Sequence, residues 1–244
     1  MAESEDIRLN KYLGLCLGLS RRAADRLLET GRVQLNGVVA KPGQSLNPER
    51  DELIFDGQTV RPPQRLQYLM LNKPEDCLVT RQDPQGRRTV YHLIPTHWQH
   101  LHPVGRLDRD SCGLLLLTND GALSQRLLHP RHKVLKSYRV RVNQPATAAQ
   151  LQQLCQGIAL DEGRTQPARI VWLPGTSDRS WLRFEIREGK KRQIRRMCKA
   201  VGLRVLYLQR DSLGPIQLGQ LAEGQCRLLS AAEIQQLQRA TGLQ

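Results

Sequence analysis

Apolar residues near the start of the chain recur at helical spacing, at Leu9, Leu13, Cys16 and Leu17. A second helix is expected over residues 21–30, with Ser20 as its N-cap and Gly31 as its stop. Leu27 and Leu28 give this helix an apolar face, and its arginines give it a charged one. The pattern therefore predicts two consecutive helices.

The apolar spacing then changes to that of strands. Residues 33–39 place Asn36-Gly37 between β-branched residues, which is a strong signal for a β-hairpin. A further strand is expected within residues 51–57. Two helices followed by a hairpin, with one basic side, predict a compact module over residues 7–57.

The rest of the chain intersperses strand and helix patterns. Short or alternating apolar runs predict strands at residues 68–71, 114–117, 134–142 and 181–187, while helical spacing covers residues 146–156 and 193–201. Ser230 and Glu233 form a capping box that opens a C-terminal helix. We therefore expect an α+β fold whose larger domain holds a mixed, largely antiparallel sheet flanked by helices.

The stretch between the two modules contains Pro62 and Pro63, which stiffen the chain and remove ladder donors. We expect a small N-terminal α/β domain at 7–57, a linker at 58–66 and a larger domain at 67–241.

The segment around Asp108 is the best candidate for chemistry. Asp108 stands between Arg106 and Arg109, just before the apolar run Leu114 to Leu117, which is expected to be a buried strand ended by a turn at residues 119–121. A carboxylate beside arginines at the mouth of a buried strand is a candidate catalytic group.

Charge favours a polyanionic partner. The 244 residues include 37 Lys and Arg against 23 Asp and Glu, a net charge of +14. The excess is concentrated in two segments, residues 8–32 and 187–210, and Glu188 is the only acid in the second. Two basic segments predict two contacts with one nucleic acid.

The cysteines, the histidines and the length of the apolar runs argue against a metal-binding protein and a membrane-spanning protein. The six cysteines form no C-x-x-C pair, so we expect reduced thiols in the cytoplasm and no zinc site. The histidines include His129 and His132 in an HPRH loop that has no other metal ligand at suitable spacing, so no metal is expected. No apolar run approaches the ~20 residues that span a membrane.

The N-terminal module resembles the S4-type RNA-binding domain. The match runs through RLNKYL, LSRRAADRLLETGRVQLNG and the strand in residues 51–57. The resemblance implies an RNA contact lined by Arg8, Lys11, Ser20, Arg21, Arg22 and Arg26. The alternative is that these arginines form only a solvated helix face.

The larger domain resembles the ribosomal RNA pseudouridine synthases that carry an S4-type domain, the small-subunit/large-subunit family. The segment GRLDRDSCGLLLLTNDG matches the central motif of that family, and LNKP, KSYRV and EGKKRQIRRM match in order around it. The resemblance covers nearly the whole chain.

This resemblance implies a cofactor-independent isomerase that acts on a flipped-out uridine of ribosomal RNA, free or in a pre-ribosomal particle. Asp108 would be the catalytic residue, with its covalent or proton-abstracting role left open, and Arg195 its ion-pair partner. Tyr138 would stack on uracil and transfer a proton, Arg106 would contact RNA or fill the gap left by the base, and Ile194 would line the pocket. Further RNA contacts would be Lys73, Lys191, Arg192, Arg196 and Lys199. A monomer without membrane contact is expected.

Two positions depart from the family pattern. Asp76 replaces a usual glycine, which leaves the conformation of its loop open, and Lys190 replaces a common arginine.

Three other functions also fit parts of the sequence. A glycoside hydrolase could use Asp108 and Asp110, but the neighbouring arginines oppose the raised pKa that its acid needs. A base-excision enzyme would also break a glycosidic bond, and release of free uracil would identify it. A non-catalytic RNA-binding assembly factor would show no turnover at all.

Overall fold

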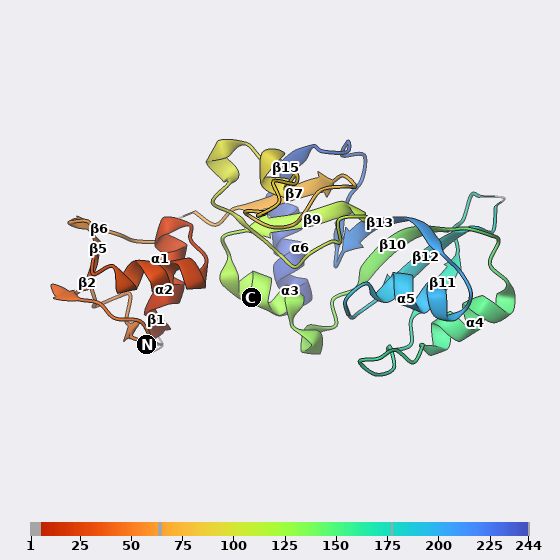
Figure 1. Cartoon of the computed structure of the whole chain (residues 1–244), viewed down its shortest axis with the longest axis horizontal. Coiled ribbons are helices and arrows are strands. Elements are labelled where there is room, and N and C mark those ends of the chain that lie inside the picture. The colour runs from red at the N-terminus through yellow and green to blue at the C-terminus, as the bar shows by residue number, and fades with distance from the viewer. Residues whose placement is uncertain (1–5, 63–64, 177, 244) are drawn as a thin grey trace. The chain divides into compact units, whose positions relative to one another are not determined.

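The computed structural model describes residues 6–62, 65–176 and 178–243. The chain divides between Leu66 and Gln67 into two compact units, each with its own core (Figure 1). The two units are described in turn.

The first unit holds two helices and short antiparallel strands. Its elements are β1 (Ile7–Arg8), α1 (Leu9–Leu17), α2 (Arg21–Glu29), β2 (Val33–Leu35), β3 (Val38–Val39), β4 (Ser45–Leu46), β5 (Leu53–Phe55) and β6 (Gln58–Thr59). One sheet has the order β3-β2-β5-β6, and β1 pairs with β4. Both helices and this sheet supply the core, through residues such as Leu13, Leu28 and Val33.

Local sequence signals explain the first unit. The Ser20 hydroxyl accepts a hydrogen bond from the Ala23 amide at 3.2 Å, which confirms the predicted N-cap. Asn36 and Gly37 both have positive φ, as the tight turn of the predicted hairpin requires. Strand β6 pairs with β5 inside the segment that we expected to be linker, and residues 63–64 of that segment lie outside the described residues.

The second unit is built on a nine-stranded sheet. Its strands are β7 (Tyr68–Lys73), β8 (His102–Pro103), β9 (Cys112–Thr118), β10 (Lys136–Val142), β11 (Arg169–Trp172), β12 (Trp181–Ile186), β13 (Val205–Leu213), β14 (Ile216–Gln217) and β15 (Cys226–Leu228). Its helices are α3 (Gly121–Leu128), α4 (Ala148–Gln156), α5 (Gln193–Ala200) and α6 (Ala231–Thr241), with 3-10 turns η1 (Val90–His92), η2 (Thr96–Trp98) and η3 (Pro130–His132).

The strand order is β11-β12-β10-β13-β9-β7-β15, with β14 beside β13 and β8 beside β9. Strands β13 and β9 run parallel, and the other pairs of this sheet in the described part of the chain are antiparallel. The expected α+β fold with a mixed, largely antiparallel sheet is confirmed.

Core packing differs between the two halves of the sheet. Strands β7 and β9 are buried on both faces, because alternate residues enter two separate clusters: Leu115 belongs to one and Leu116 to the other. Helices α3 and α6 supply the second cluster, while α4 and α5 supply the first. Figure 1 shows α3 and α6 beside β9, and α4 and α5 beside β10 to β12.

Most expected elements of this unit are present. Residues 114–117 lie inside β9, and the predicted capping box at Ser230 opens α6. Strand β9 ends at Thr118, before the turn predicted at residues 119–121, and Asp120 in that turn also caps α3, because its carboxylate accepts a hydrogen bond from the Leu123 amide at 2.9 Å. Among the described residues, no helix is long and apolar enough to cross a membrane.

Candidate active site

A cavity of about 730 Å³ opens in the second unit, beside the segment that precedes β9. Four of the five residues predicted for catalysis and its support line it: Arg106, Asp108, Tyr138 and Ile194. They come from three separate elements, namely the loop before β9, strand β10 and helix α5. The fold thus gathers these side chains around one space.

Asp108 lies in a turn that is closed by a hydrogen bond of 3.1 Å from the Ser111 amide to the Asp108 carbonyl. Its side chain is 37% exposed, so its carboxylate is accessible within the lined cavity. Residues 111–118 that follow are all buried, and they anchor this turn to the sheet.

Lys73 anchors the same turn through hydrogen bonds from the core, so its predicted role in RNA binding is corrected. Lys73 was expected to bind RNA, but it is fully buried at the end of β7. Its ammonium donates to the carbonyls of Ser111 at 2.7 Å, Pro74 at 2.9 Å and Arg109 at 3.4 Å. Burial lowers the pKa of Lys73, and the three carbonyl contacts use the donors that RNA would need.

The expected ion pair between Arg195 and Asp108 is also corrected. Arg195 instead lies with its Nε 3.3 Å from the Asp110 carboxylate, and its Nη2 donates to the Asp110 carbonyl and to the Ser111 hydroxyl. Its side chain is 14% exposed. The guanidinium is aimed at the backbone two residues beyond Asp108, so it braces the turn.

Among the described residues, Arg192 is the one basic residue that lies within 4 Å of the Asp108 carboxylate. Its Nη1 atom is 3.9 Å from that carboxylate. It also donates two hydrogen bonds to the Asp110 carboxylate, at 3.0 and 2.8 Å. Its backbone is left-handed, with φ of 49°, at the start of α5. Arg192 thus stands between two carboxylates.

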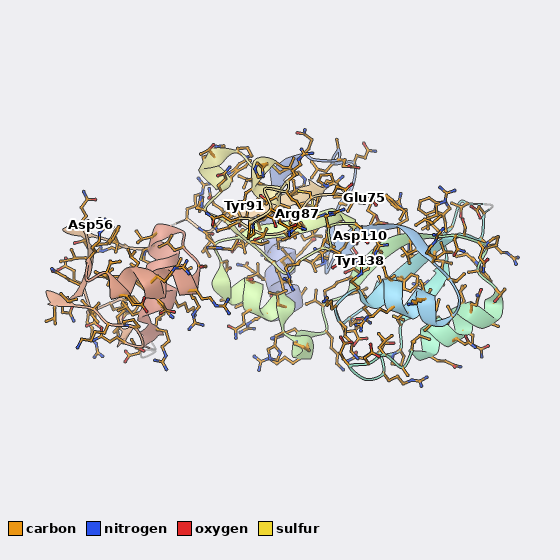
Figure 2. The ribbon with its side chains drawn as sticks, viewed as in Figure 1. Asp56, Glu75, Arg87, Tyr91, Asp110 and Tyr138 are labelled. Atoms are coloured by element: carbon orange, nitrogen blue, oxygen red, sulfur yellow. The ribbon has the colours of Figure 1, made fainter. Side chains whose placement is uncertain are left out.

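The electrostatics of Asp110 follow from this pairing. Burial acts to raise the pKa of Asp110, but the hydrogen bond from Arg192 and the charges of Arg195 and Arg192 together lower it. Asp110 therefore stays ionised and ties α5 to the turn. Figure 2 labels Asp110 and Tyr138 in the part of the molecule where β9, β10 and α5 meet.

Tyr138, on β10, lines the cavity. Its side chain is 8% exposed, and its strand neighbours are Phe184 and Arg210. Its hydroxyl has no hydrogen-bond partner among the described residues. The ring shares its wall with apolar side chains, which are Leu107, Ile186, Ile194 and Leu208. The cavity therefore combines a flat apolar surface with one free hydroxyl.

A loop that sequence reasoning missed forms another wall. Asp83 and Arg87 line the cavity and pair with each other at 2.7 Å. The Arg87 side chain, with the amides of Arg87 and Gln85, lowers the pKa of Asp83 to about 2. The sequence Asp83-Pro84-Gln85-Gly86 is a turn signal that indicates this loop.

Asp76 adopts the conformation that favours glycine. Its φ is 54°, in the left-handed region that aspartate tolerates better than most residues. Its carboxylate lies 3.2 Å from Arg109 Nε, beside the turn that carries Asp108. Asp76, which replaces the usual glycine of the family, therefore has a left-handed backbone and forms an ion pair with Arg109.

The remaining basic residues of this unit differ in availability. Lys191 and Lys199 are exposed, and Lys191 lines the cavity. Arg196 is half-buried and pairs with Glu162 at 2.6 Å. Lys190 donates to the carbonyls of Gly163 and Arg164 and so fixes a neighbouring loop.

In the first unit, the residues predicted to contact RNA are all exposed: Arg8, Lys11, Ser20, Arg21, Arg22 and Arg26. Arg8 donates to the Gly43 carbonyl at 2.6 Å, and Arg21 donates to Asn10 at 3.3 Å. Lys11, Arg22 and Arg26 have no side-chain partner among the described residues. In the same described ranges, no group of three or more His, Cys, Asp or Glu could hold a metal ion.

Comparison with known proteins decides the family. Residues 67–200 match the family model of RNA pseudouridylate synthase, and residues 7–52 match the S4 domain. The chain belongs to the RNA pseudouridine synthase family. It is an isomerase of uridine in RNA that carries an S4-type RNA-binding domain.

Pseudouridine synthases resemble this chain along its whole length. An uncharacterized RNA pseudouridine synthase of Aquifex aeolicus is 40% identical, over 98% of this chain and 96% of the relative. The ribosomal large subunit pseudouridine synthase B of Bacillus subtilis is 35% identical, over 94% and 95%. The ribosomal small subunit pseudouridine synthase A of Yersinia pestis is 37% identical, over 93% and 97%.

A solved structure agrees. The crystal structure of a pseudouridylate synthase superposes with a TM-score of 0.69 and 33% identity, and covers 95% of this chain and 99% of that one. The pseudouridine synthase fold expected from the resemblance is therefore confirmed.

Proposed function

We propose that this pseudouridine synthase isomerises a specific uridine of ribosomal RNA, with Asp108 as the catalytic carboxylate and the target base flipped into the cavity. The observation that supports this most directly is the convergence of Asp108 and Tyr138 on one cavity of about 730 Å³. Ribosomal RNA is favoured because relatives from Bacillus subtilis and Yersinia pestis are named for the ribosomal subunits.

The reaction moves one bond. The bond between N1 of uracil and C1′ of ribose breaks, C5 bonds to C1′, the proton on C5 leaves and N1 gains a proton. No atom is gained or lost overall, so no cofactor is required. Asp108 attacks the sugar or takes a proton from it.

Tyr138 supplies the second function. Its ring stacks on the uracil, and its unpaired hydroxyl takes part in proton transfer at C5. Ile194 completes the apolar wall, and Arg106, which is exposed at the rim, contacts RNA or fills the gap left by the base.

Arg192 and Arg195 support the site in different ways. Arg192 places a positive charge 3.9 Å from the Asp108 carboxylate. Arg195 holds the turn through Asp110, so it is a positioning residue. This division replaces the single ion pair implied by the family resemblance.

Extrusion of the uridine costs a few kcal/mol, which stacking in the pocket and phosphate contacts offset. The phosphate contacts come from the S4-type unit, through Arg8, Lys11, Ser20, Arg21, Arg22 and Arg26, and from Lys191, Arg192, Arg196 and Lys199 beside the cavity. RNA affinity should fall steeply as salt rises. We also infer a monomer that acts in the cytoplasm.

The test uses unmodified small- and large-subunit ribosomal RNA transcripts with the full chain. Wild type should form pseudouridine at one position, and Asp108→Asn should lower turnover by more than about a hundredfold while RNA affinity stays within twofold. Asp161→Asn, an exposed aspartate outside the cavity, is the matched control.

Three outcomes contradict the proposal. Full turnover in Asp108→Asn removes the catalytic assignment. Release of free uracil indicates base excision instead of isomerisation. The absence of wild-type turnover on either transcript, or in assembled particles, favours a protein that only binds RNA.

A further inference from the structure

One half of the large sheet presents a polar face on the side away from the catalytic cavity. In β10, Tyr138 and Val140 enter the core that α4 and α5 also supply, while Arg139 and Arg141, which alternate with them, are exposed. Strand side chains alternate between faces, so these arginines point to the opposite side from Tyr138. Register places Arg183 and Trp181 of β12 on the same face.

This face is hollowed. A cavity of about 470 Å³ lies over β10, β12 and β13 and reaches the turn before β14. Its lining includes Ser137, Arg139, Arg183, Gln209, Asp211 and Ser212. It shares no lining residue with the catalytic cavity.

Two arginines in the hollow oppose each other. Arg139 and Arg183 are direct partners in the antiparallel register of β10 and β12. Like charges in directly opposite positions destabilise a sheet. The Asp211 carboxylate forms an ion pair with Arg139 at 3.4 Å. It also accepts a hydrogen bond of 2.9 Å from the Gln209 side-chain amide.

Arg183 makes no such close contact, although its charge, like that of Arg139, acts on Asp211. Its guanidinium has no hydrogen bond or ion pair among the described residues, and Glu185, the other acid in the hollow, pairs with Arg169 at 3.4 Å. Among the described residues of β10 to β13 on this face, there are thus four arginines, Arg139, Arg141, Arg169 and Arg183, and two acids, Glu185 and Asp211. A phosphate would satisfy Arg183 and relieve its repulsion with Arg139.

Aromatic rings extend the surface along the strands. The Arg141 guanidinium lies 5.7 Å from the centre of the Trp181 ring, and the Trp181 and Tyr207 rings are 5.8 Å apart. Tyr207 is the cross-strand partner of Arg141. Cations interleaved with aromatic rings on an open sheet are a common surface for single-stranded nucleic acid, because phosphates and bases are bound side by side.

We propose that this face, defined by Arg139, Arg141, Arg183, Trp181 and Tyr207, is a second RNA-binding surface. A phosphate lies between Arg139 and Arg183, and the strand continues over Arg141 toward Trp181 and Tyr207, where a base stacks. The proposal rests on RNA as the substrate. It adds that the enzyme holds an RNA segment remote from the target uridine.

The position of the face determines which RNA it can hold. An RNA chain that leaves the catalytic cavity must pass an edge of the β-sheet before it reaches Arg183. The contact therefore belongs to RNA outside the immediate neighbourhood of the target, and long transcripts gain more from it than short fragments.

The test measures RNA affinity of the full chain against salt. The probes are unmodified ribosomal RNA transcripts and a twelve-residue oligouridylate. Arg139→Gln with Arg183→Gln should weaken binding of the transcripts about tenfold and reduce the slope of log K against log salt by about 0.7, because the contact with the one phosphate between them is lost. The matched control, Arg131→Gln with Arg239→Gln, removes two exposed arginines elsewhere and should bind as wild type.

A second readout does not depend on activity or on the stability of the double variant. Ultraviolet crosslinking of the oligouridylate to Asp108→Asn protein should yield modified peptides that contain Trp181 or Tyr207. Wild-type affinity in the double variant, or crosslinks that avoid β12 and β13, overturns the proposal. A dimer that dissociates only in the double variant also overturns it, because the face then binds a second copy of the chain.

These results separate the two proposals. Crosslinks on the face in a protein that isomerises no uridine would contradict the proposed function alone. Isomerisation with unchanged binding in the double variant would contradict the second surface alone.

Discussion

The ammonium of Lys73 donates a hydrogen bond of 2.7 Å to the carbonyl oxygen of Ser111, three residues after Asp108. This contact joins the end of β7 to the turn that carries the candidate catalytic carboxylate. A charged group in the core thus orders the backbone of the site instead of touching the substrate.

Lys73→Met tests this role. Methionine keeps the length of the side chain but leaves the carbonyls of Pro74 and Ser111 without their donor, so we expect a loss of about 2 kcal/mol in the free energy of unfolding, measured in urea. Lys199→Met, at an exposed lysine, should change stability by less than about 0.5 kcal/mol. If Lys73→Met lowered RNA affinity with unchanged stability, the original RNA-binding assignment would be right.

Asp108 and Asp110 should respond differently to the same substitution. Asp110→Asn removes the carboxylate that pairs with Arg192 and with the largely buried Arg195, and should lower the free energy of unfolding by about 1–2 kcal/mol. Asp108→Asn loses only one contact of 3.9 Å at a half-exposed side chain, and should cost less than about 0.5 kcal/mol. Equal stability losses in the two variants would contradict the division of roles.

Gly113 lies where β9 meets β13, and a side chain does not fit there. Its φ is 99°, and a Cβ atom would lie 2.4 Å from the Arg210 carbonyl oxygen and 2.7 Å from its amide nitrogen. Gly113→Ala should therefore lower the free energy of unfolding by about 3 kcal/mol. Gly163 has φ of 95° with nothing within 4 Å of a Cβ, so Gly163→Ala should cost only about 1 kcal/mol.

Acid stability should depend on Glu233. The hydrogen bonds from Arg227, at 2.7 and 2.8 Å, lower the pKa of Glu233 from 4.5 to about 2 despite partial burial. Between these values the unfolded chain binds the proton more readily than the folded one, so this contribution is present above pH 4.5 and is lost as pH falls toward 2.

Glu233→Gln should thus lower the urea midpoint at pH 7 and flatten its decline below pH 4.5. Glu223→Gln, at an exposed glutamate without an ion pair among the described residues, should leave the decline as in wild type. An unchanged decline in Glu233→Gln would show that other carboxylates control acid unfolding.

Local signals predicted much of the fold because they act over a few residues. Ser20 caps α2, Asn36-Gly37 turns the hairpin, and Ser230 with Glu233 opens α6, as the sequence indicated. The predicted turn at residues 119–121 does end β9, but the role of Asp120 as the N-cap of α3 was not predicted. A capping aspartate and a turn aspartate have similar local sequences, and the apolar face of α3 decides between them.

The sequence by itself determined the family, the α+β class and the motif that carries Asp108, because these depend on residue types and their order along the chain. Only the tertiary structure decided which charges meet. It placed Lys73 in the core, gave Arg195 to Asp110 and Arg192 to both carboxylates, and left Arg183 open on the far face of the sheet. Ion pairs depend on distances of a few ångströms between segments far apart in sequence, and strand register and helix position alone fix those distances.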